Sequence, residues 1–349
     1  MPELPFLTAE IPGIGGTLKQ HPEDFIVEEI PVYRPSGVGE HLFLWIEKRG
    51  VAAPELLRHI ARTLGISSGD IGVAGMKDKQ AVTRQYVSVP ARAADKLAEI
   101  DTEAIRVLQA SQHGNKLRTG QLRGNRFMIL IRDVDDDALA RAEKIAARVF
   151  RLGFPNYFGE QRFGRAGETS QLGFALLRGE KRPGDIPYKK RKFLLKLALS
   201  AAQAELFNAA LAQRMADGLL DRVLPGDVMQ VVESRGPFIA EDVSVEQQRL
   251  NVGETAITGP MFGPKMKRPT DDVLAREQQL LADYHLDASA FTRFPKLTTG
   301  TRRPYLIRPE GLTIEPADEG LRFGFTLPAG VYATTLLREF KKTDLQTDD

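Results

Sequence analysis

Residues 24–30, DFIVEEI, and residues 41–48, HLFLWIEK, alternate apolar and polar side chains with a period of two. This alternation is typical of β-strands that bury one face. The stretch between them, Pro35–Gly39 (PSGVG), contains turn-forming residues. The sequence therefore predicts that a β-sheet forms the core of the N-terminal part of the chain.

Similar patterns extend the prediction outward from this pair of strands. Further strands are predicted at residues 85–89, 105–109, 126–132, 305–307 and 321–327. Apolar residues at helical spacing predict helices at residues 54–64, 135–152, 196–216, 270–284 and 332–341. Pro54 suits a first helical turn and Gly65 a C-cap. Asp135–Asp137 suits a helix start, because the helix dipole favours negative charge there; a metal site is the alternative, but no other ligand types lie nearby.

The pattern changes after Gly153 and changes back near residue 300. The segment between contains an alanine-rich helical pattern and stretches punctuated by Gly and Pro, such as Leu224–Asp227 and Ile257–Lys265. The sequence predicts an α/β (α+β) fold with a mixed sheet flanked by helices. Residues 1–152 and 300–349 form its discontinuous first domain, and residues 153–299 are inserted. Residues 343–349, TDLQTDD, are expected to be a frayed acidic tail.

Composition narrows the class of protein. The 349 residues are 42% hydrophobic and 27% charged, which is typical of a soluble globular protein of about two domains. The absence of cysteine excludes disulfides and thiolate metal sites and suits a reducing cytosol. No apolar run has membrane-spanning length, and the N-terminus lacks the pattern of an export signal. We therefore expect a cytoplasmic protein with no membrane association.

Basic residues are unevenly distributed, although the formal net charge is only +2. Residues 104–132 and 288–309 contain no Asp or Glu but several Arg and Lys, and Lys189–Lys192 forms a third basic cluster. Any one such stretch is by default solvated surface. Three of them together indicate a polyanion as partner.

One short motif stands out as chemically reactive. Residues 75–85 are GMKDKQAVTRQ, in which Asp78 lies between Lys77 and Lys79. Nearby positive charge favours the ionised form of a carboxylate, which can act as a nucleophile or a base. The five histidines are scattered, no Ser-centred nucleophile motif occurs, and Gly13–Gly16 lacks the residues of a nucleotide-binding loop. Asp78 is therefore the first candidate for a reacting group.

The same motif and five other segments, in order along the chain, resemble the TruD family of tRNA pseudouridine synthases. They are KQHPEDFIVEE (19–29), GEH (39–41), GMKDKQAVTRQ (75–85), LRGNRF (122–127), PNYFGEQRFG (155–164), and LPAGVYAT (327–334) with Arg338-Glu339. One departure is Ala53, where the family commonly has threonine. Alanine there puts the start of a helix in doubt more than it does the chemistry.

The resemblance implies an isomerase that converts uridine at position 13 of tRNA to pseudouridine without a cofactor or metal. Asp78 would be catalytic, and Phe25, Asn125, Phe127 and Phe325 would bind the flipped-out nucleotide. Asp78 would attack the nucleoside covalently or remove the ribose 2′ proton, and both routes stay open. The basic partner of Asp78 would be Lys19, with Lys77 and Arg338 as alternatives.

The resemblance also implies the architecture and the partner. Residues 1–152 and 300–349 would be the pseudouridine-synthase catalytic domain, and residues 153–299 an inserted α/β TRUD domain. We expect a monomer whose partner is tRNA, held in a cleft lined by the basic stretches. Two other classes compete: a non-catalytic RNA-binding protein, and another RNA-modifying enzyme such as a methyltransferase. The latter is disfavoured because no glycine-rich cofactor loop follows a strand.

Overall fold

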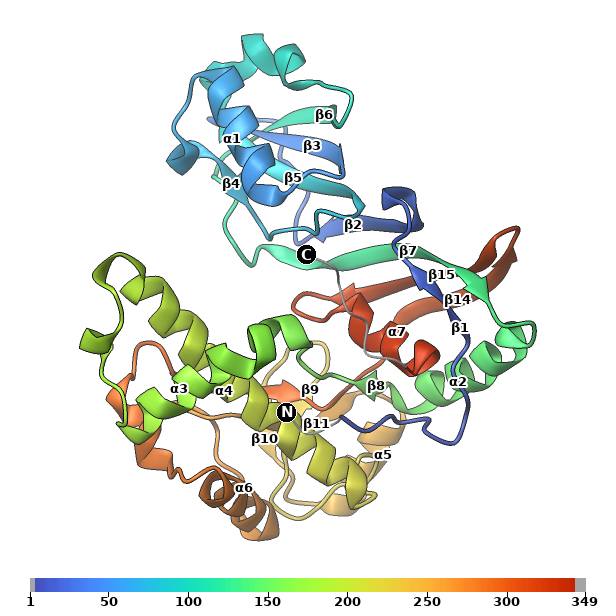
Figure 1. Ribbon diagram of the computed structural model, residues 1–349, viewed down its shortest axis with the longest axis vertical. Helices are drawn as coiled ribbons and strands as arrows, with labels where there is room; N and C mark the ends of the chain where they lie inside the picture. The colour runs from blue at the N-terminus through green and yellow to red at the C-terminus, as the bar shows by residue number, and fades with distance from the viewer. Residues whose placement is uncertain (1–3, 343–349) are drawn as a thin grey trace. The chain divides into compact units, whose positions relative to one another are not determined.

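The computed structural model describes residues 4–342, which form two compact units (Figure 1). The sheet unit comprises Ile11–Phe150, Pro309–Ala333 and the residues from Phe340 onward. The helical unit comprises the residues up to Glu10, Arg151–Arg308 and Thr334–Glu339. The predicted acidic tail, residues 343–349, lies outside the described residues.

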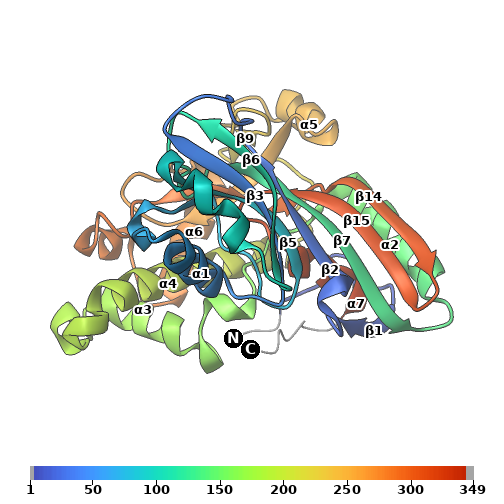
Figure 2. The same ribbon diagram turned by 90° about the horizontal axis from the view of Figure 1, so that it is seen from above.

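The sheet unit is built on a mixed sheet of nine strands among the described residues. Seven of them lie side by side in the order β14-β15-β7-β2-β5-β3-β6 (Figure 2), while β1 pairs with β7 and β4 with β5. Only the β2–β5 pair is parallel. The strands are β1 (Gly15–Leu18), β2 (Phe25–Pro31), β3 (His41–Arg49), β4 (Gly72–Val73), β5 (Val82–Pro90), β6 (Ile105–His113), β7 (Leu122–Val134), β14 (Glu310–Ala317) and β15 (Gly320–Pro328). The predicted mixed, largely antiparallel sheet is confirmed.

Helices cover the sheet where its strands present apolar side chains. Helix α1 (Ala53–Leu64) packs Leu56, Ile60 and Leu64 into one core with buried residues of β3 and β5. It ends at Gly65, whose φ of 65° is left-handed, as the predicted C-cap requires. The helix begins without a side-chain cap at Ala52, so the alanine at position 53 does not prevent its formation.

The acidic triplet Asp135–Asp137 precedes helix α2 (Ala138–Leu152), as predicted. Asp135 and Asp137 both form ion pairs with Arg141, one helical turn into α2. The last helix, α7 (Ala333–Lys341), packs Phe340 against Phe323 of β15, with ring centres 5.0 Å apart. Among the described residues, no helix combines the length and apolar composition needed to cross a membrane.

The helical unit combines a helix layer with a smaller sheet of strands in the order β10-β9-β11-β12. Its helices are α3 (Glu168–Arg178), α4 (Tyr188–Ala216), α5 (Val243–Asn251) and α6 (Asp271–Asp283). Its strands are β8 (Phe154–Pro155), β9 (Val228–Val231), β10 (Pro237–Ile239), β11 (Thr255–Met261), β12 (Thr301–Pro304) and β13 (Leu306–Ile307). Helices α3 and α4 approach closely at Gly173, where a Cβ atom would lie 2.1 Å from the carbonyl oxygen of Ala198.

The sequence prediction did not include helices α3 and α5, strands β1 and β4, or most strands of the helical unit. Two further differences have clear physical reasons. Helix α4 begins at Tyr188 rather than at residue 196, because its first turns are exposed and carry charges instead of an apolar stripe. Strand β14 is absent from the prediction, since as an edge strand it buries no residue fully and its apolar alternation is confined to Leu312 and Ile314. Strand β14 is held by its pairing with β15, which a local pattern does not reveal.

The basic stretch 288–309 is largely committed to internal contacts. Arg302 is buried and donates to Glu277 at 2.7 Å, and burial raises the pKa of Glu277 although Arg302 opposes the shift. Arg303 donates to the side chain of Asn156. Arg308 donates to the main-chain carbonyls of Arg151 and Leu250. These three arginines serve the helical unit rather than a phosphate-binding face.

A buried ion pair locks the start of β2 to β7. Asp24, 1% exposed, accepts hydrogen bonds at 2.7–3.0 Å from two nitrogens of Arg132. Burial tends to raise the pKa of Asp24, but the bonds from Arg132 and His21 outweigh burial and the pKa is lowered. This pair fixes the register of the strand that follows Asp24.

We expect Asp24→Asn to lower the free energy of unfolding by about 1 to 3 kcal/mol at pH 7, because Arg132 loses its buried counterion and keeps only the exposed Glu319. Since the folded pKa of Asp24 is depressed, its contribution is present above about pH 4 and lost as pH falls below that value. Urea unfolding at pH 7 and pH 3 measures both effects. Asp136→Asn, at an exposed carboxylate, is the control, and an equal effect of both variants at pH 7 would contradict the assignment.

Candidate active site around Asp78

Asp78 lies in the loop of residues 74–81, which connects β4 to β5 and has no regular secondary structure. Its side chain is 58% exposed. The loop leads directly into β5, a strand paired on both sides by β2 and β3. An accessible carboxylate is therefore held next to the middle of the sheet.

Lys19 is the cation that the structure places on Asp78. Its Nζ lies 3.2 Å from Oδ2 of Asp78, and its side chain is only 8% exposed. Lys19 follows β1 and has a φ of 59°, a left-handed conformation that is uncommon for lysine. The same Nζ lies 4.4 Å from the ring centre of Phe25. The side chain thus links the carboxylate to the aromatic face of the sheet.

The other two predicted partners of Asp78 make different contacts. The Nζ of Lys77 lies 2.8 Å from Oε2 of Glu29, and both side chains are buried. Arg338, in α7, donates to the main-chain carbonyls of Leu4 and Pro5, and its guanidinium lies 3.8 Å from the ring centre of Phe6. These three contacts of Arg338 lie within the helical unit.

The predicted binding phenylalanines form a row across three strands. Phe127 of β7 is paired in register with Phe325 of β15, and their rings stack with centres 5.3 Å apart. Phe25 of β2 meets the edge of Phe127, with centres 6.2 Å apart. The three residues are 2–7% exposed, so most of each ring packs in the sheet unit. The row begins at Phe25, next to Lys19, and continues through Phe127 to Phe325.

Asn125 lies in the next row of the same face. It is paired in register with Glu29 of β2 and Leu327 of β15. Gly124 beside it is required by this pairing, because a Cβ atom there would lie 2.3 Å from the carbonyl oxygen of Leu327. The motif at residues 122–127 is therefore set by close strand packing as well as by the asparagine.

Several oxygen atoms in these rows are buried without a hydrogen-bond partner among the described residues. They are Oδ1 of Asn125, Oε1 of Glu29, Oε1 of Gln85 and Oγ1 of Thr83. Such groups are uncommon in native proteins, and each is available to a ligand or to water. Glu29, Gln85 and Thr83 were not predicted from the sequence.

Lys48 is a further residue that the sequence analysis missed. It is fully buried, and its Nζ donates to the main-chain carbonyl of Asp78 at 2.7 Å and to that of Val51 at 2.8 Å. Burial lowers the pKa of Lys48 to about 8; the charge of Asp78 opposes this shift and that of Lys77 adds to it. The signal in the sequence is its position, in phase with the buried Leu44 and Ile46 of β3.

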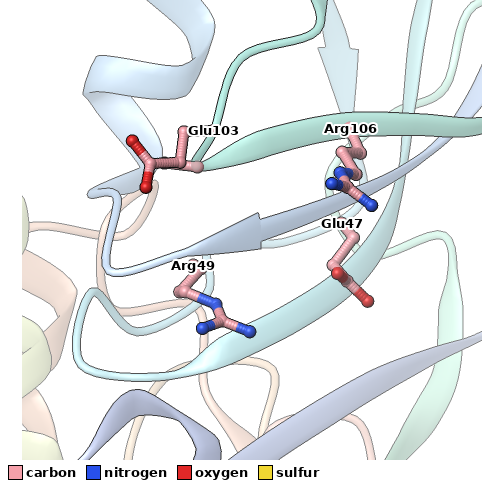
Figure 3. A pocket seen from close by; sticks show the side chains of 5 residues that line it. Glu47, Arg49, Glu103 and Arg106 are labelled. Atoms are coloured by element: carbon pink, nitrogen blue, oxygen red, sulfur yellow. The ribbon is translucent and has the colours of Figure 1, made fainter.

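Two pockets on the same sheet lie apart from this constellation. One, of about 260 Å³, is lined by Glu47, Arg49, Glu103, Ala104 and Arg106 (Figure 3). The other, of about 340 Å³, borders Phe127 and Phe325 but is also lined by Arg126, Met128 and Thr326. Strand alternation points those three side chains to the face opposite the rings. Of the residues described around Asp78, only Phe127 and Phe325 line one of these pockets, the second.

The chemistry available at Asp78 is that of a carboxylate beside an ammonium group and an aromatic wall. An exposed carboxylate paired with one lysine can attack an electrophilic carbon or accept a proton. Within residues 4–342, no group of three or more His, Asp or Glu side chains is arranged to hold a metal ion.

Comparison with known proteins relates the whole chain to one family. The family model described as tRNA pseudouridine synthase D (TruD) matches residues 3–183 and 190–340. Proteins named tRNA pseudouridine synthase D are similar over nearly their full length. One from Anaeromyxobacter dehalogenans is 43% identical, covering 99% of each chain. One from Thermus thermophilus is 42% identical, covering 97% of this chain and 92% of the relative.

A solved structure supports the same relationship. The crystal structure from Methanosarcina mazei that bears the name putative tRNA pseudouridine synthase D (TruD) superposes with a TM-score of 0.77 at 25% identity. The match covers 96% of this chain and 95% of the other.

Proposed function

Because the chain belongs to the TruD family of tRNA pseudouridine synthases, we propose that it converts uridine 13 of tRNA to pseudouridine, with Asp78 as the reacting group. The observation that carries the proposal is the exposed Asp78 carboxylate paired with the nearly buried Lys19. We propose that residues 1–152 and 300–349 form the catalytic domain, to which the sheet unit contributes residues 11–150 and 309–333, and that residues 153–299 form the inserted domain. We propose that the enzyme acts as a monomer in the cytoplasm, where tRNA is used.

The reaction breaks the N1–C1′ bond of uridine, turns the uracil and joins its C5 to C1′. In one route the Asp78 carboxylate attacks the nucleoside and is later displaced by C5. In the other it removes the 2′ proton as the uracil leaves from C1′, which gives a glycal, and the proton returns to C2′ when C5 bonds to C1′. In both routes C5 finally loses its proton to solvent and N1 gains one, and the positive charge of Lys19 offsets the charge on the carboxylate.

The reaction needs no co-substrate on grounds of stoichiometry. Substrate and product are isomers, no electrons are gained or lost, and no group is transferred to the nucleoside from elsewhere. The enzyme therefore has to position the nucleotide, hold the freed uracil and move protons. We propose that it does so without a cofactor or metal.

The target nucleotide must leave its stack to reach Asp78. We propose that Phe25, Phe127 and Phe325 form the wall against which the base lies, and that contact is made through the small exposed part of the rings. Asn125 would read the uracil edge, because its unpartnered Oδ1 can accept a hydrogen bond from N3–H. The row of unpartnered oxygens beside it supports a polar ligand at this place.

Two other functions compete with this one: a non-catalytic RNA-binding protein and another RNA-modifying enzyme such as a methyltransferase. A binding protein gives no reason to hold a carboxylate on a buried lysine at 3.2 Å. A methyltransferase needs a cofactor loop that the sequence does not contain. Both alternatives predict an inactive protein in an assay for pseudouridine.

We expect Asp78→Asn to bind tRNA as the wild type does and to form no pseudouridine, because an amide is neither a nucleophile nor a base here. Release of tritium from C5-labelled uridine in tRNA measures the reaction. Asp95→Asn, at an exposed carboxylate of the same unit, should retain wild-type activity. An active Asp78→Asn variant would refute the catalytic assignment.

We expect the Lys19→Met variant to lose activity and the Lys77→Met variant to lose stability. Lys19→Met removes the positive charge that pairs with the Asp78 carboxylate, so we expect kcat to fall by about 10-fold or more with little loss of stability. Lys77→Met leaves the buried Glu29 carboxylate without its cation, which costs about 3 kcal/mol of folding free energy. Tritium release and urea unfolding of both variants separate the effects; the reverse pattern would make Lys77 the functional partner.

A stripe on helix α4 supports a polyanion as substrate. Lys189, Lys192, Phe193 and Lys196 recur at helical spacing and are all largely exposed or half-exposed, with Phe193 at 68%. The chain has no Asp or Glu from Ile186 to Ala204. An exposed ring among lysines suits an unpaired base flanked by phosphates. We propose that this stripe contacts tRNA.

Replacing each kind of residue in the stripe should weaken tRNA binding differently. Phe193→Ala should raise the dissociation constant about 5-fold or more without changing its salt dependence, because stacking is not ionic. Lys192→Gln should lower the slope of log affinity against log salt by about 1. Phe150→Ala, at a Phe that is 83% exposed outside the stripe, is the control. If the two Phe variants bind tRNA with equal affinity, the stripe does not contact tRNA.

A further inference from the structure

Lys48 is a charged side chain in the interior of the sheet unit, beneath the loop that carries Asp78. It is 0% exposed, whereas its neighbours Glu47 and Arg49 point to the opposite face and line the pocket of Figure 3. A buried ammonium group has lost its water, so the protein must supply its hydrogen bonds. Where those bonds go shows what the residue does.

Both bonds of the Lys48 ammonium go to main-chain carbonyls. The acceptors are Val51, at 2.8 Å, which follows β3, and Asp78, at 2.7 Å, in the loop of residues 74–81. The side chain therefore joins the end of β3 to the residue whose carboxylate carries the proposed chemistry.

The loop has few other restraints near Asp78. In the described part of the chain, its own main-chain bonds are Ala81 N–H to Lys79 at 2.8 Å and the bonds at its ends. Side chains supply the remaining support, through Lys48, the Lys77–Glu29 pair and the Lys19–Asp78 pair. Of these, only Lys48 holds the backbone of Asp78 itself.

Packing alone does not account for a lysine at this position. Replacing a buried charge by an apolar side chain of similar volume is often neutral or stabilising. Burial here is severe enough to lower the pKa of Lys48 to about 8. The free-energy cost of burying the Lys48 ammonium group is explained if its hydrogen bonds are needed to hold the loop of residues 74–81 rather than to stabilise the core.

We propose that Lys48 is a positioning residue, whose ammonium group fixes the carbonyl of Asp78 and thereby aims the carboxylate at the nucleoside. The inference rests on the proposed catalytic role of Asp78. Lys19 then sets the charge around the carboxylate, and Lys48 sets where its backbone lies. A shift of about 1 Å in such a group can cost about 100-fold in rate.

The decisive variant is Lys48→Met, which keeps the side chain's length and removes the donor. We expect kcat for tritium release to fall 10- to 100-fold, KM for tRNA to stay within about 2-fold, and the thermal midpoint to be unchanged or raised. Amide hydrogen exchange across residues 74–81 should become faster without tRNA. Lys341→Met is the matched control, because that lysine also donates to a main-chain carbonyl, that of Gly16 at 2.6 Å; its kcat should equal that of the wild type.

Three results would overturn the inference. They are a kcat for Lys48→Met within about 2-fold of the wild type, a loss of kcat fully matched by loss of folded protein, or unchanged exchange in residues 74–81. An inactive wild type, or an active Asp78→Asn variant, would instead overturn the proposed function. The exchange experiment does not depend on activity and so separates the two.

Should Lys48→Met not fold, the pH profile of the wild type decides. The charged groups that act on Lys48 are Asp78 and Lys77, which are themselves paired with Lys19 and Glu29. With its pKa near 8, Lys48 is charged below that pH and loses its proton above it, so its bonds weaken from charge-assisted to neutral. We expect kcat to decline from about pH 8 upward, and a flat kcat through about pH 9 would overturn the inference.

Discussion

The register of β7 is the constraint on which the proposed site depends. This strand is hydrogen-bonded by β2 on one side and β15 on the other, so a shift by one residue would turn every side chain to the opposite face. The register places Phe127 beside Phe325, and Asn125 beside Glu29. The buried Asp24–Arg132 pair holds β7 in this alignment. Gly124 permits it, because a side chain there would clash with Leu327 of β15.

Three lysines divide the work around Asp78. Lys19 binds the carboxylate, Lys48 binds the carbonyl of the same residue, and Lys77 ties the neighbouring position to Glu29. Each ammonium group is largely or fully buried, while Asp78 itself is 58% exposed. The cations are therefore fixed before a substrate arrives, which is the arrangement that electrostatic catalysis requires.

Local patterns predicted the elements of the sheet unit well, because its central strands alternate cleanly and α1 carries both an apolar stripe and a C-cap glycine. The pairing of Lys19 with Asp78, 59 residues apart, followed only from family resemblance. Lys48 was missed because its partners are main-chain atoms of residues that a sequence pattern does not bring together. Arg302, Arg303 and Arg308 were predicted to bind phosphate because their acceptors inside the protein lie far away in sequence and no local pattern reveals them.

The pairing of β7 with β15 also determines when the site comes into existence. During synthesis, β2, β5 and β7 emerge early, but their sheet lacks β15 until the whole segment from α2 to β14 has been made. Until then one edge of β7 has unpaired main-chain groups, and the ring of Phe127 lacks its neighbour Phe325. A ribosome-bound chain therefore holds the Asp78 motif before the row of phenylalanine rings is complete, so the proposed site is assembled only late in folding.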